Sequence, residues 1–227
     1  MFRMIYYCIG TEPLDAVSVA NSLYGMRCMS SSHVEVRRIL TALTRHINAC
    51  VEELPAKQIG NALYGMRNMS SRHAEVRELL LAMSRHVTNA GMLDAQAIGN
   101  SLYGMRQLSA EHPEVRTLLR ALIPHAAACT EQMNGQEIAN ALYGLRLMSS
   151  KHKEVRGMLE ILTVQVSNCT QPFRAQEVGN AMYGMKNMSS DHAEVRELLT
   201  AIAPVMMRCR DRLNPQEISN AFVGLQY

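Results

Sequence analysis

A single phrase recurs along the chain at a nearly constant interval. Residues 59–69 read IGNALYGMRNM, and close variants return before and after them. The intervals between the equivalent asparagines are 40, 39, 40, 40 and 40 residues. These asparagines are Asn21, Asn61, Asn100, Asn140, Asn180 and Asn220. Such a period is typical of solenoids, in which each unit buries its apolar face against its neighbours. We therefore expect residues 1–227 to form one repeat domain of about five units, with partial units at both ends.

Each unit opens with the pattern of an amphipathic helix. Asp94, Asn134 and Asn214 are of the types that cap helix N-termini, and Glu137 completes a capping box with Asn134. Apolar residues of the third unit at i, i+4, i+7 and i+10 predict one buried face, formed by Ile98, Leu102, Met105 and Leu108. A recurring glycine is expected inside this helix, where it costs about 1 kcal/mol relative to alanine. We expect a neighbouring helix to approach closely at Gly25, Gly65, Gly104, Gly144 and Gly184.

A second helix is predicted after a serine-rich break such as MSSRH at residues 69–73. In the third unit Pro113, which follows His112, suits the first turn of a helix. Its predicted buried stripe consists of Val115, Leu118, Leu119, Leu122 and Ala126. This helix should run to about the recurring cysteine that is Cys129 in this unit. Two antiparallel helices per unit predict an all-α fold, a right-handed α-solenoid.

The recurring HxEVR block is interpreted as structural. Glu75 and Arg77 point to roughly opposite sides of a helix, so we expect the glutamate of one unit to meet the arginine of the next. The result would be a ladder of ion pairs along the stack. The histidine of the block recurs at a helix start, and we expect it to form loop or capping hydrogen bonds. These histidines are His33, His73, His112, His152 and His192.

Composition and motifs exclude several classes of function. Hydrophobic residues make up 48% of the chain, enough for a core, whereas a net charge of +3 does not by itself indicate nucleic acid. The six cysteines form no CxxC pair and no zinc-type cluster, so we expect no metal site and no cofactor. Nothing assembles a nucleophile, a base and an oxyanion site, which argues against an enzyme and a small-molecule substrate. No apolar run is long enough for membrane insertion, and the opening MFRMIYYCIG resembles neither a secretory signal nor a transit peptide.

The face of the first helix opposite the buried stripe is the candidate site. In successive units it presents an amide or lysine, an asparagine, a tyrosine, and a variable residue, with a cation one turn aside. In the second and third units these residues are Lys57, Asn61, Tyr64, Arg67, Asn68, Gln96, Asn100, Tyr103, Arg106 and Gln107. In the fourth and fifth units they are Gln136, Asn140, Tyr143, Arg146, Leu147, Gln176, Asn180, Tyr183, Lys186 and Asn187.

This combination of side chains suits single-stranded RNA. Amides can pair with base edges, tyrosine offers a face on which a base can stack, and a periodic cation can meet phosphates. The alternative is structural: stacked asparagines and tyrosines can form ladders between neighbouring helices, and arginine stems can cover apolar surface. The position of Cys28, Asn68, Gln107, Leu147 and Asn187 varies among otherwise similar units, which suits a residue that selects a partner.

The repeat also resembles a known family. IANALYGLRLM and IGNALYGMRNM are similar to the first helix of octotricopeptide repeats, with the typical phrase L-A-N-T-L-W-A-L-A-K-L, and HPEVRTLL is similar to the opening of that family's second helix. Tyrosine and glycine stand where the family has tryptophan and alanine. The resemblance covers essentially the whole chain and implies an α-solenoid that binds single-stranded RNA in mitochondria or chloroplasts. By motif position, it implies that the RNA contacts fall on the asparagine, tyrosine and variable residues named above.

Two functions are therefore expected from the sequence. The first is an organellar RNA-binding protein acting in RNA maturation, stability, translation or ribosome assembly. The alternative is a non-catalytic scaffold that binds protein subunits of a larger organellar complex. A cationic stripe beside the asparagines and tyrosines favours RNA, whereas an apolar, methionine-rich face favours protein.

Overall fold

The computed structural model describes residues 14–226, a range that contains helices, turns and loops but no strand. The first helices of successive units are α2 (Ala16–Gly25), α4 (Ala56–Gly65), α6 (Ala95–Gly104), α8 (Gly135–Gly144), α10 (Ala175–Gly184) and α12 (Pro215–Val223). The second helices are α3 (Val34–Ala49), α5 (Ala74–Asn89), α7 (Pro113–Ala128), α9 (Lys153–Asn168) and α11 (Ala193–Met207). The short 3₁₀ turn η1 (Met26–Cys28) follows α2.

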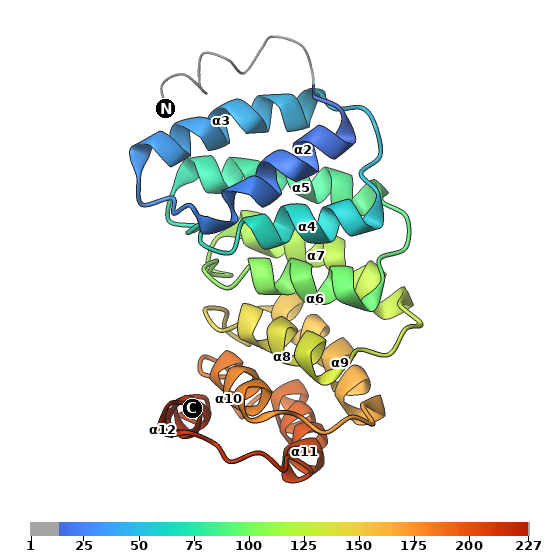
Figure 1. Cartoon of the computed structure of the whole chain (residues 1–227), viewed down its shortest axis with the longest axis vertical. Coiled ribbons are helices and arrows are strands. Elements are labelled where there is room, and N and C mark those ends of the chain that lie inside the picture. The colour runs from blue at the N-terminus through green and yellow to red at the C-terminus, as the bar shows by residue number, and fades with distance from the viewer. Residues whose placement is uncertain (1–13, 227) are drawn as a thin grey trace.

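The helices stack in two layers. Each first helix packs on the first helices of the neighbouring units, and each second helix packs on the neighbouring second helices. Figure 1 shows the first helices following one another down the long axis of the molecule, from α2 to α12. This consecutive helix-on-helix packing confirms an all-helical chain of the helical-repeat kind.

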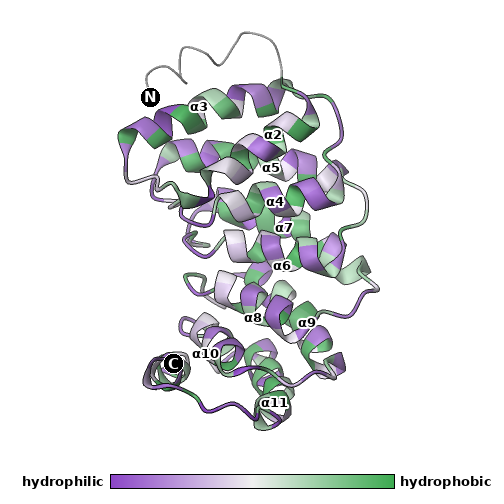
Figure 2. Cartoon of the chain, viewed as in Figure 1, coloured by the Kyte–Doolittle hydropathy of each residue, from purple (hydrophilic) through white to green (hydrophobic). Residues whose placement is uncertain are grey.

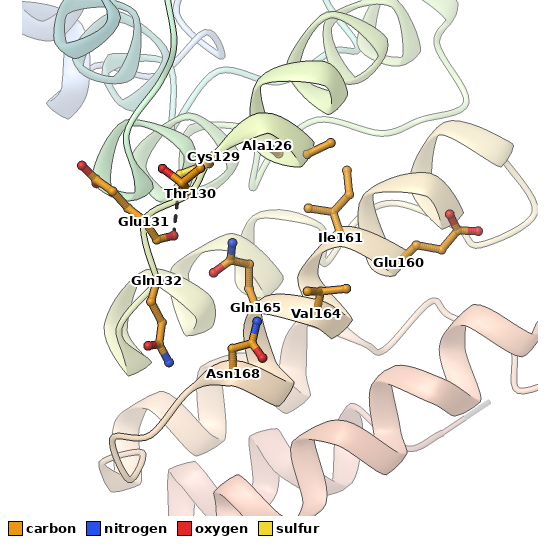
Figure 3. Close-up of a pocket in the computed structure, with 11 residues that line it drawn as sticks. Ala126, Cys129, Thr130, Glu131, Gln132, Glu160, Ile161, Val164, Gln165 and Asn168 are labelled. Carbon is orange, nitrogen blue, oxygen red and sulfur yellow. Dashed lines mark hydrogen bonds between the residues drawn. The ribbon is translucent and has the colours of Figure 1, made fainter.

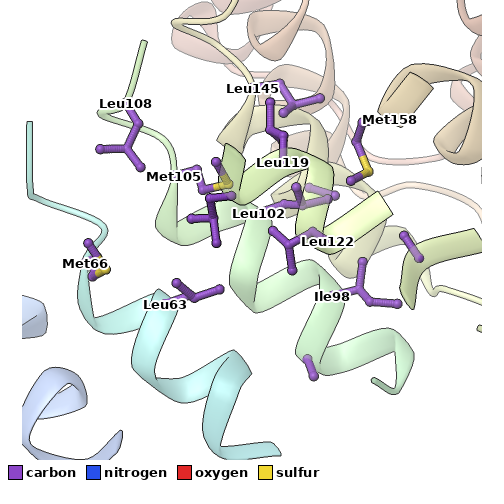
Figure 4. Packing of buried hydrophobic residues seen from close by; sticks show 14 of the residues in the cluster. Leu63, Met66, Ile98, Leu102, Met105, Leu108, Leu119, Leu122, Leu145 and Met158 are labelled. Carbon is purple, nitrogen blue, oxygen red and sulfur yellow. The ribbon is translucent and has the colours of Figure 1, made fainter. Parts of the chain in front are cut away.

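The two layers share one continuous apolar core that extends from Ala16 in α2 to Val205 in α11. Every residue of the predicted stripes is buried in the third unit, from Ile98 in α6 to Ala126 in α7. Figure 4 shows side chains of three successive units, such as Leu63, Leu102 and Leu145, contributing to the same cluster. Because each unit completes the core of the next, removal of a unit exposes apolar surface on two others.

The predicted helix starts are confirmed. The Asp94 carboxylate accepts a hydrogen bond of 2.6 Å from the backbone N–H of Ala97. Asn134 and Glu137 form the expected capping box, and the same box recurs at Asn214. These caps satisfy backbone donors that have no partner within the first turn of a helix.

The predicted length of the first helix is wrong at its C-terminal end. We expected Gly104 inside the helix, but α6 ends there. The N–H of Met105 bonds to the carbonyl of Leu102, three residues back, and the N–H of Leu108 bonds to Met105 in the same way. The chain therefore tightens into 3₁₀-type turns after the glycine, as helix ends commonly do. Arg106 consequently lies on a turn that follows the helix.

The predicted close approach at the glycines is confirmed from the second unit onward. A Cβ on Gly65, Gly104, Gly144 or Gly184 would overlap a backbone carbonyl of the preceding first helix. At Gly25, in contrast, a Cβ would meet no described atom within 4 Å. The glycines thus allow backbone-to-backbone contact between the C-terminal ends of successive first helices, which a side chain would block.

The predicted ion pairs occur at three junctions, but in the opposite direction along the chain. The arginine of one unit meets the glutamate of the next in the pairs Arg37–Glu75, Arg77–Glu114 and Arg156–Glu194, at 3.5, 3.6 and 3.2 Å. The ladder is interrupted at Glu154, which pairs at 2.6 Å with Arg120 of the preceding second helix. Which unit supplies the arginine and which the glutamate depends on the direction in which the units stack. The spacing of residues within one unit does not specify that direction.

The recurring histidines occupy the N-cap positions of the second helices, but their side chains do not cap the helix backbone. Two of them contact the preceding unit: His152 lies 3.3 Å from Glu111, and His192 lies 3.1 Å from the Ser150 hydroxyl. The expected loop hydrogen bonds are present for this pair, whereas the expected capping bonds are absent throughout the described residues.

The recurring cysteines lie where the second helices end. Cys50 and Cys169 are buried, and burial raises the pKa of the Cys129 and Cys169 thiols, which makes the reactive thiolate scarcer. Cys8 and the opening MFRMIYYCIG lie outside the described residues. Within the described part of the chain, no helix combines the length and apolar character that a membrane crossing requires.

Candidate nucleic-acid interface

A continuous row of tyrosine rings runs along the layer of first helices. It consists of Tyr24, Tyr64, Tyr103, Tyr143 and Tyr183. Neighbouring ring centroids are 6.1, 5.6, 5.9 and 5.8 Å apart along this tyrosine row, with interplanar angles of 19–30°. The row exists because, from Tyr64 onward, each tyrosine directly precedes the glycine at which its helix touches the preceding first helix. Rings at equivalent positions are therefore brought within stacking distance.

A row of cations accompanies the tyrosines. It consists of Arg27, Arg67, Arg106, Arg146 and Lys186. Each cation lies over the ring of the tyrosine in its own unit, 4.5–4.9 Å from the ring centroid. This is the geometry of a cation–π interaction. No member of this cation row forms an ion pair with a carboxylate of the described residues.

The members of the cation row differ in how firmly they are held. Arg106 donates to the Arg67 carbonyl at 3.0 Å, to the Asn68 side-chain oxygen at 2.7 Å and to the Tyr103 hydroxyl. Arg67 and Arg146 donate no side-chain hydrogen bond to any residue between 14 and 226. Their guanidinium groups therefore keep their full capacity to bind an anion.

The variable position has a role within the chain that sequence reasoning missed. The Asn68 amide donates to the Arg27 carbonyl at 3.0 Å, and the Asn187 amide donates to the Arg146 carbonyl at 2.8 Å. Each bond joins two units by satisfying a carbonyl in the turn after a first helix. Leu147 cannot form this bond. The prediction that this position selects a partner thus competes with an observed structural use.

The asparagine row is the open part of the site. It consists of Asn61, Asn100, Asn140 and Asn180. These side chains are half-buried, and none of their amides hydrogen-bonds to another residue of the described chain. Exposed side chains continue the face toward the start of each first helix: Lys57, Gln96, Gln136 and Gln176. The structural alternative, a ladder of asparagines and tyrosines between neighbouring helices, is therefore seen in the contacts of the tyrosine rings but not for these asparagines, whose amides remain able to bind a ligand.

The hydropathy of the first helices agrees with one buried face and one open face. Figure 2 shows hydrophilic and hydrophobic residues alternating along the first helices, as expected when one face is buried and the other open. Methionines at the ends of these helices, such as Met66, Met105 and Met185, belong to the core and are 1–3% exposed. The open face thus carries amides and cations.

A separate groove lies on the layer of second helices. It occupies about 720 Å³ between α7 and α9, and its lining includes Ile161, Val164, Glu131, Glu160 and Gln165 (Figure 3). It shares no residue with the tyrosine, cation or asparagine rows. No cluster of three or more histidine, cysteine or acidic side chains suited to a metal is found within residues 14–226.

No family model matches the chain, and no curated protein sequence is significantly similar to it.

Proposed function

We propose that the chain is a right-handed α-solenoid of about five units that binds single-stranded RNA along its first helices. The observation that carries this proposal is the cation row, which holds five cations in line without a carboxylate partner in the described chain. Placement of the protein in mitochondria or chloroplasts comes from the resemblance to octotricopeptide repeats alone.

The electrostatics of the cation row favour a polyanion. Each cation lies over its own ring, and neighbouring rings are 5.6–6.1 Å apart, so successive cations lie close to one another along the row. Two unit charges about 6 Å apart repel by roughly 0.7 kcal/mol in bulk water, and by more near a protein surface. A strand of phosphates along the row would replace this repulsion with attraction and release its counterions.

The neighbouring groups favour nucleic acid over an apolar protein partner. Open amides of the asparagine row flank the cations, and they can donate to and accept from sugar and base groups. The methionines at the ends of the first helices, such as Met66, Met105 and Met185, lie in the core and not on this face. A protein scaffold that uses this face would need an acidic, amide-compatible partner.

The test is binding of single-stranded RNA across a salt series. If all five cations meet phosphates, the logarithm of the binding constant should fall with the logarithm of salt concentration with a slope of about −3.5. The double variant Arg67→Gln and Arg146→Gln removes the two guanidiniums that have no hydrogen bond, and it should reduce the slope by about 1.4.

A matched control removes the same charge elsewhere. Arg38 and Arg45 are exposed on α3, in the layer of second helices. The double variant Arg38→Gln and Arg45→Gln should leave the slope unchanged. Equal losses in both double variants would indicate general electrostatic attraction and not a site. No binding of any strand at low salt would favour the scaffold instead.

A further inference from the structure

We propose that this face holds the sugar-phosphate backbone and does not read the bases, so that it accepts single strands of any sequence. The inference rests on the proposed function, because it specifies which part of the strand the same site recognises. Three features of the site support it. Neighbouring tyrosines cover the faces of the rings, Asn68 and Asn187 already hydrogen-bond within the chain, and the groups that remain open are nearly the same in every unit.

The tyrosine faces have no room for bases. Tyr64, Tyr103 and Tyr143 each have a tyrosine on both sides, with ring centroids 5.6–6.1 Å apart. A base inserted between two rings needs two stacking intervals of about 3.4 Å each, which exceeds this spacing. The units cannot easily separate, because glycine brings the backbones of the first helices into contact beside the rings.

The cation row also limits access of bases to the tyrosine rings. Each guanidinium or ammonium group also lies over a ring of the row, within 4.9 Å of its centroid. A base that stacked on the same ring surface would have to displace that cation, which is the group expected to bind phosphate. The tyrosines are therefore positioning residues: each ring contacts the cation of its own unit, and the hydroxyls of Tyr103 and Tyr183 accept hydrogen bonds from Arg106 and Lys186.

The position that differs most between units is committed to contacts within the chain in two of them. Asn68 and Asn187 donate their amides to backbone carbonyls of the preceding unit, whereas Leu147 offers no hydrogen bond and the Gln107 side chain forms none with the described residues. Asn68 also accepts from Arg106. A base reader at Asn68 or Asn187 would have to give up a contact between units, which would leave a carbonyl without its partner.

The groups that remain open are nearly the same in every unit. They are the asparagine row, the helix-start side chains Lys57, Gln96, Gln136 and Gln176, and the guanidinium groups of Arg67 and Arg146. Identical groups in successive units present identical donors and acceptors to successive nucleotides, so they can at most favour one base throughout and cannot read a sequence of mixed bases. Uniform cations, in contrast, match the uniform charge of the backbone.

The experiment compares strands that share a backbone and differ in their bases. The intact chain would be titrated at one salt concentration with oligouridylate, oligocytidylate and an abasic oligoribonucleotide, each of about twelve nucleotides. We expect all three dissociation constants to agree within about threefold, because the phosphate contacts dominate. An abasic strand that binds more than about tenfold more weakly, or homopolymers that differ by that factor, would overturn the inference.

A second arm tests the open amides directly. Asn100→Ala combined with Asn140→Ala removes two of them without touching the cation row. We expect the ratio between the homopolymers to stay the same in this variant, and a changed ratio would show that the amides read bases. Failure of the proposed function looks different, because no strand, abasic or not, would then bind and the Arg67→Gln/Arg146→Gln variant would behave as the native chain.

Discussion

Gly104 at the end of α6 lies directly against the backbone carbonyl of Leu63 in α4, with no space for a Cβ between them. The same contact recurs at each later junction of first helices. It places the two helices close enough for their tyrosines to stack, with Tyr64 and Tyr103 ring centroids 5.6 Å apart. The surface row and the interior contact therefore have one geometric cause.

Gly104→Ala should destabilise the protein, although alanine is the better helix former. The new methyl group would overlap the Leu63 carbonyl, and such overpacking costs about 1–3 kcal/mol. Gly25→Ala is the matched control, because a Cβ there meets no described atom within 4 Å. This variant should stabilise the protein by about 0.4–1 kcal/mol, because alanine reduces the conformational entropy of the unfolded chain. Urea midpoints measure both, and midpoints that shift in the same direction would contradict the contact.

Tyr103→Ala should lower the urea midpoint more than Tyr103→Phe. The alanine variant loses ring contacts on both sides, and an aromatic pair contributes about 0.5–1.5 kcal/mol beyond its buried area. The phenylalanine variant keeps both contacts and loses only the hydroxyl that meets Arg106. If the two variants lost equal stability, the hydroxyl and not the stacked rings would be the important group.

A ladder of serines links the loops, and it has one gap that can be filled. The buried Ser71 hydroxyl accepts the backbone N–H of Ser109 in the next unit at 2.9 Å, and Ser31 and Ser150 do the same at 2.8 Å for the units that follow them. Ala110 occupies this position in the third unit, where no such bond reaches the N–H of Ser149 among the described residues.

Ser71→Ala should therefore destabilise by about 1–3 kcal/mol, since it leaves a backbone donor without a partner. Ala110→Ser should stabilise by about 0.5–1.5 kcal/mol by completing the ladder. In thermal melts, the melting temperature should therefore fall in the Ser71→Ala variant and rise in the Ala110→Ser variant. A destabilised Ala110→Ser variant would mean that the site has no room for the hydroxyl.

Glu154 should make stability depend on pH. Its side chain is 7% exposed. Burial is the largest single effect and raises its pKa, but the hydrogen bond from Arg120, a backbone hydrogen bond and the charges of Arg120 and Lys153 together outweigh burial and hold the pKa below its ordinary value of 4.5. A carboxylate with a lowered folded-state pKa stabilises the fold above the unfolded-state pKa, and this contribution is lost as pH falls through the folded-state value.

Glu154→Gln removes the charge at every pH. Its urea midpoint should lie below that of the native chain at neutral pH, and the difference should shrink as pH falls below 4.5. Glu160→Gln, on the exposed side of the same helix, is the control and should show little difference at either pH. A Glu154→Gln difference that stayed constant down to acid pH would exclude the Arg120 pair as its source.

Much of the fold was predictable because its determinants are local. The period of 40 residues, the caps at Asp94 and Asn134, and the apolar stripe from Val115 to Ala126 each depend on residues within a few turns of one another. The glycine contacts were also predictable. A recurring glycine in a helix costs stability, and the close approach of a neighbouring helix, which a Cβ would block, offsets that cost. The candidate face could be located by the same helical geometry.

The sequence by itself determined that the chain forms paired helices with one buried and one polar face, because that pattern is written in the spacing of single residues. Only the tertiary structure decided how far apart the units lie. That distance determines which surface groups are covered or hydrogen-bonded and which stay open. At 5.6–6.1 Å the tyrosines cover one another, Asn68 reaches the Arg27 carbonyl, and Arg37 pairs with the glutamate ahead of it. These contacts join residues about 40 positions apart, and their geometry follows from the distance and direction in which neighbouring helices pack, which no pattern within a unit specifies.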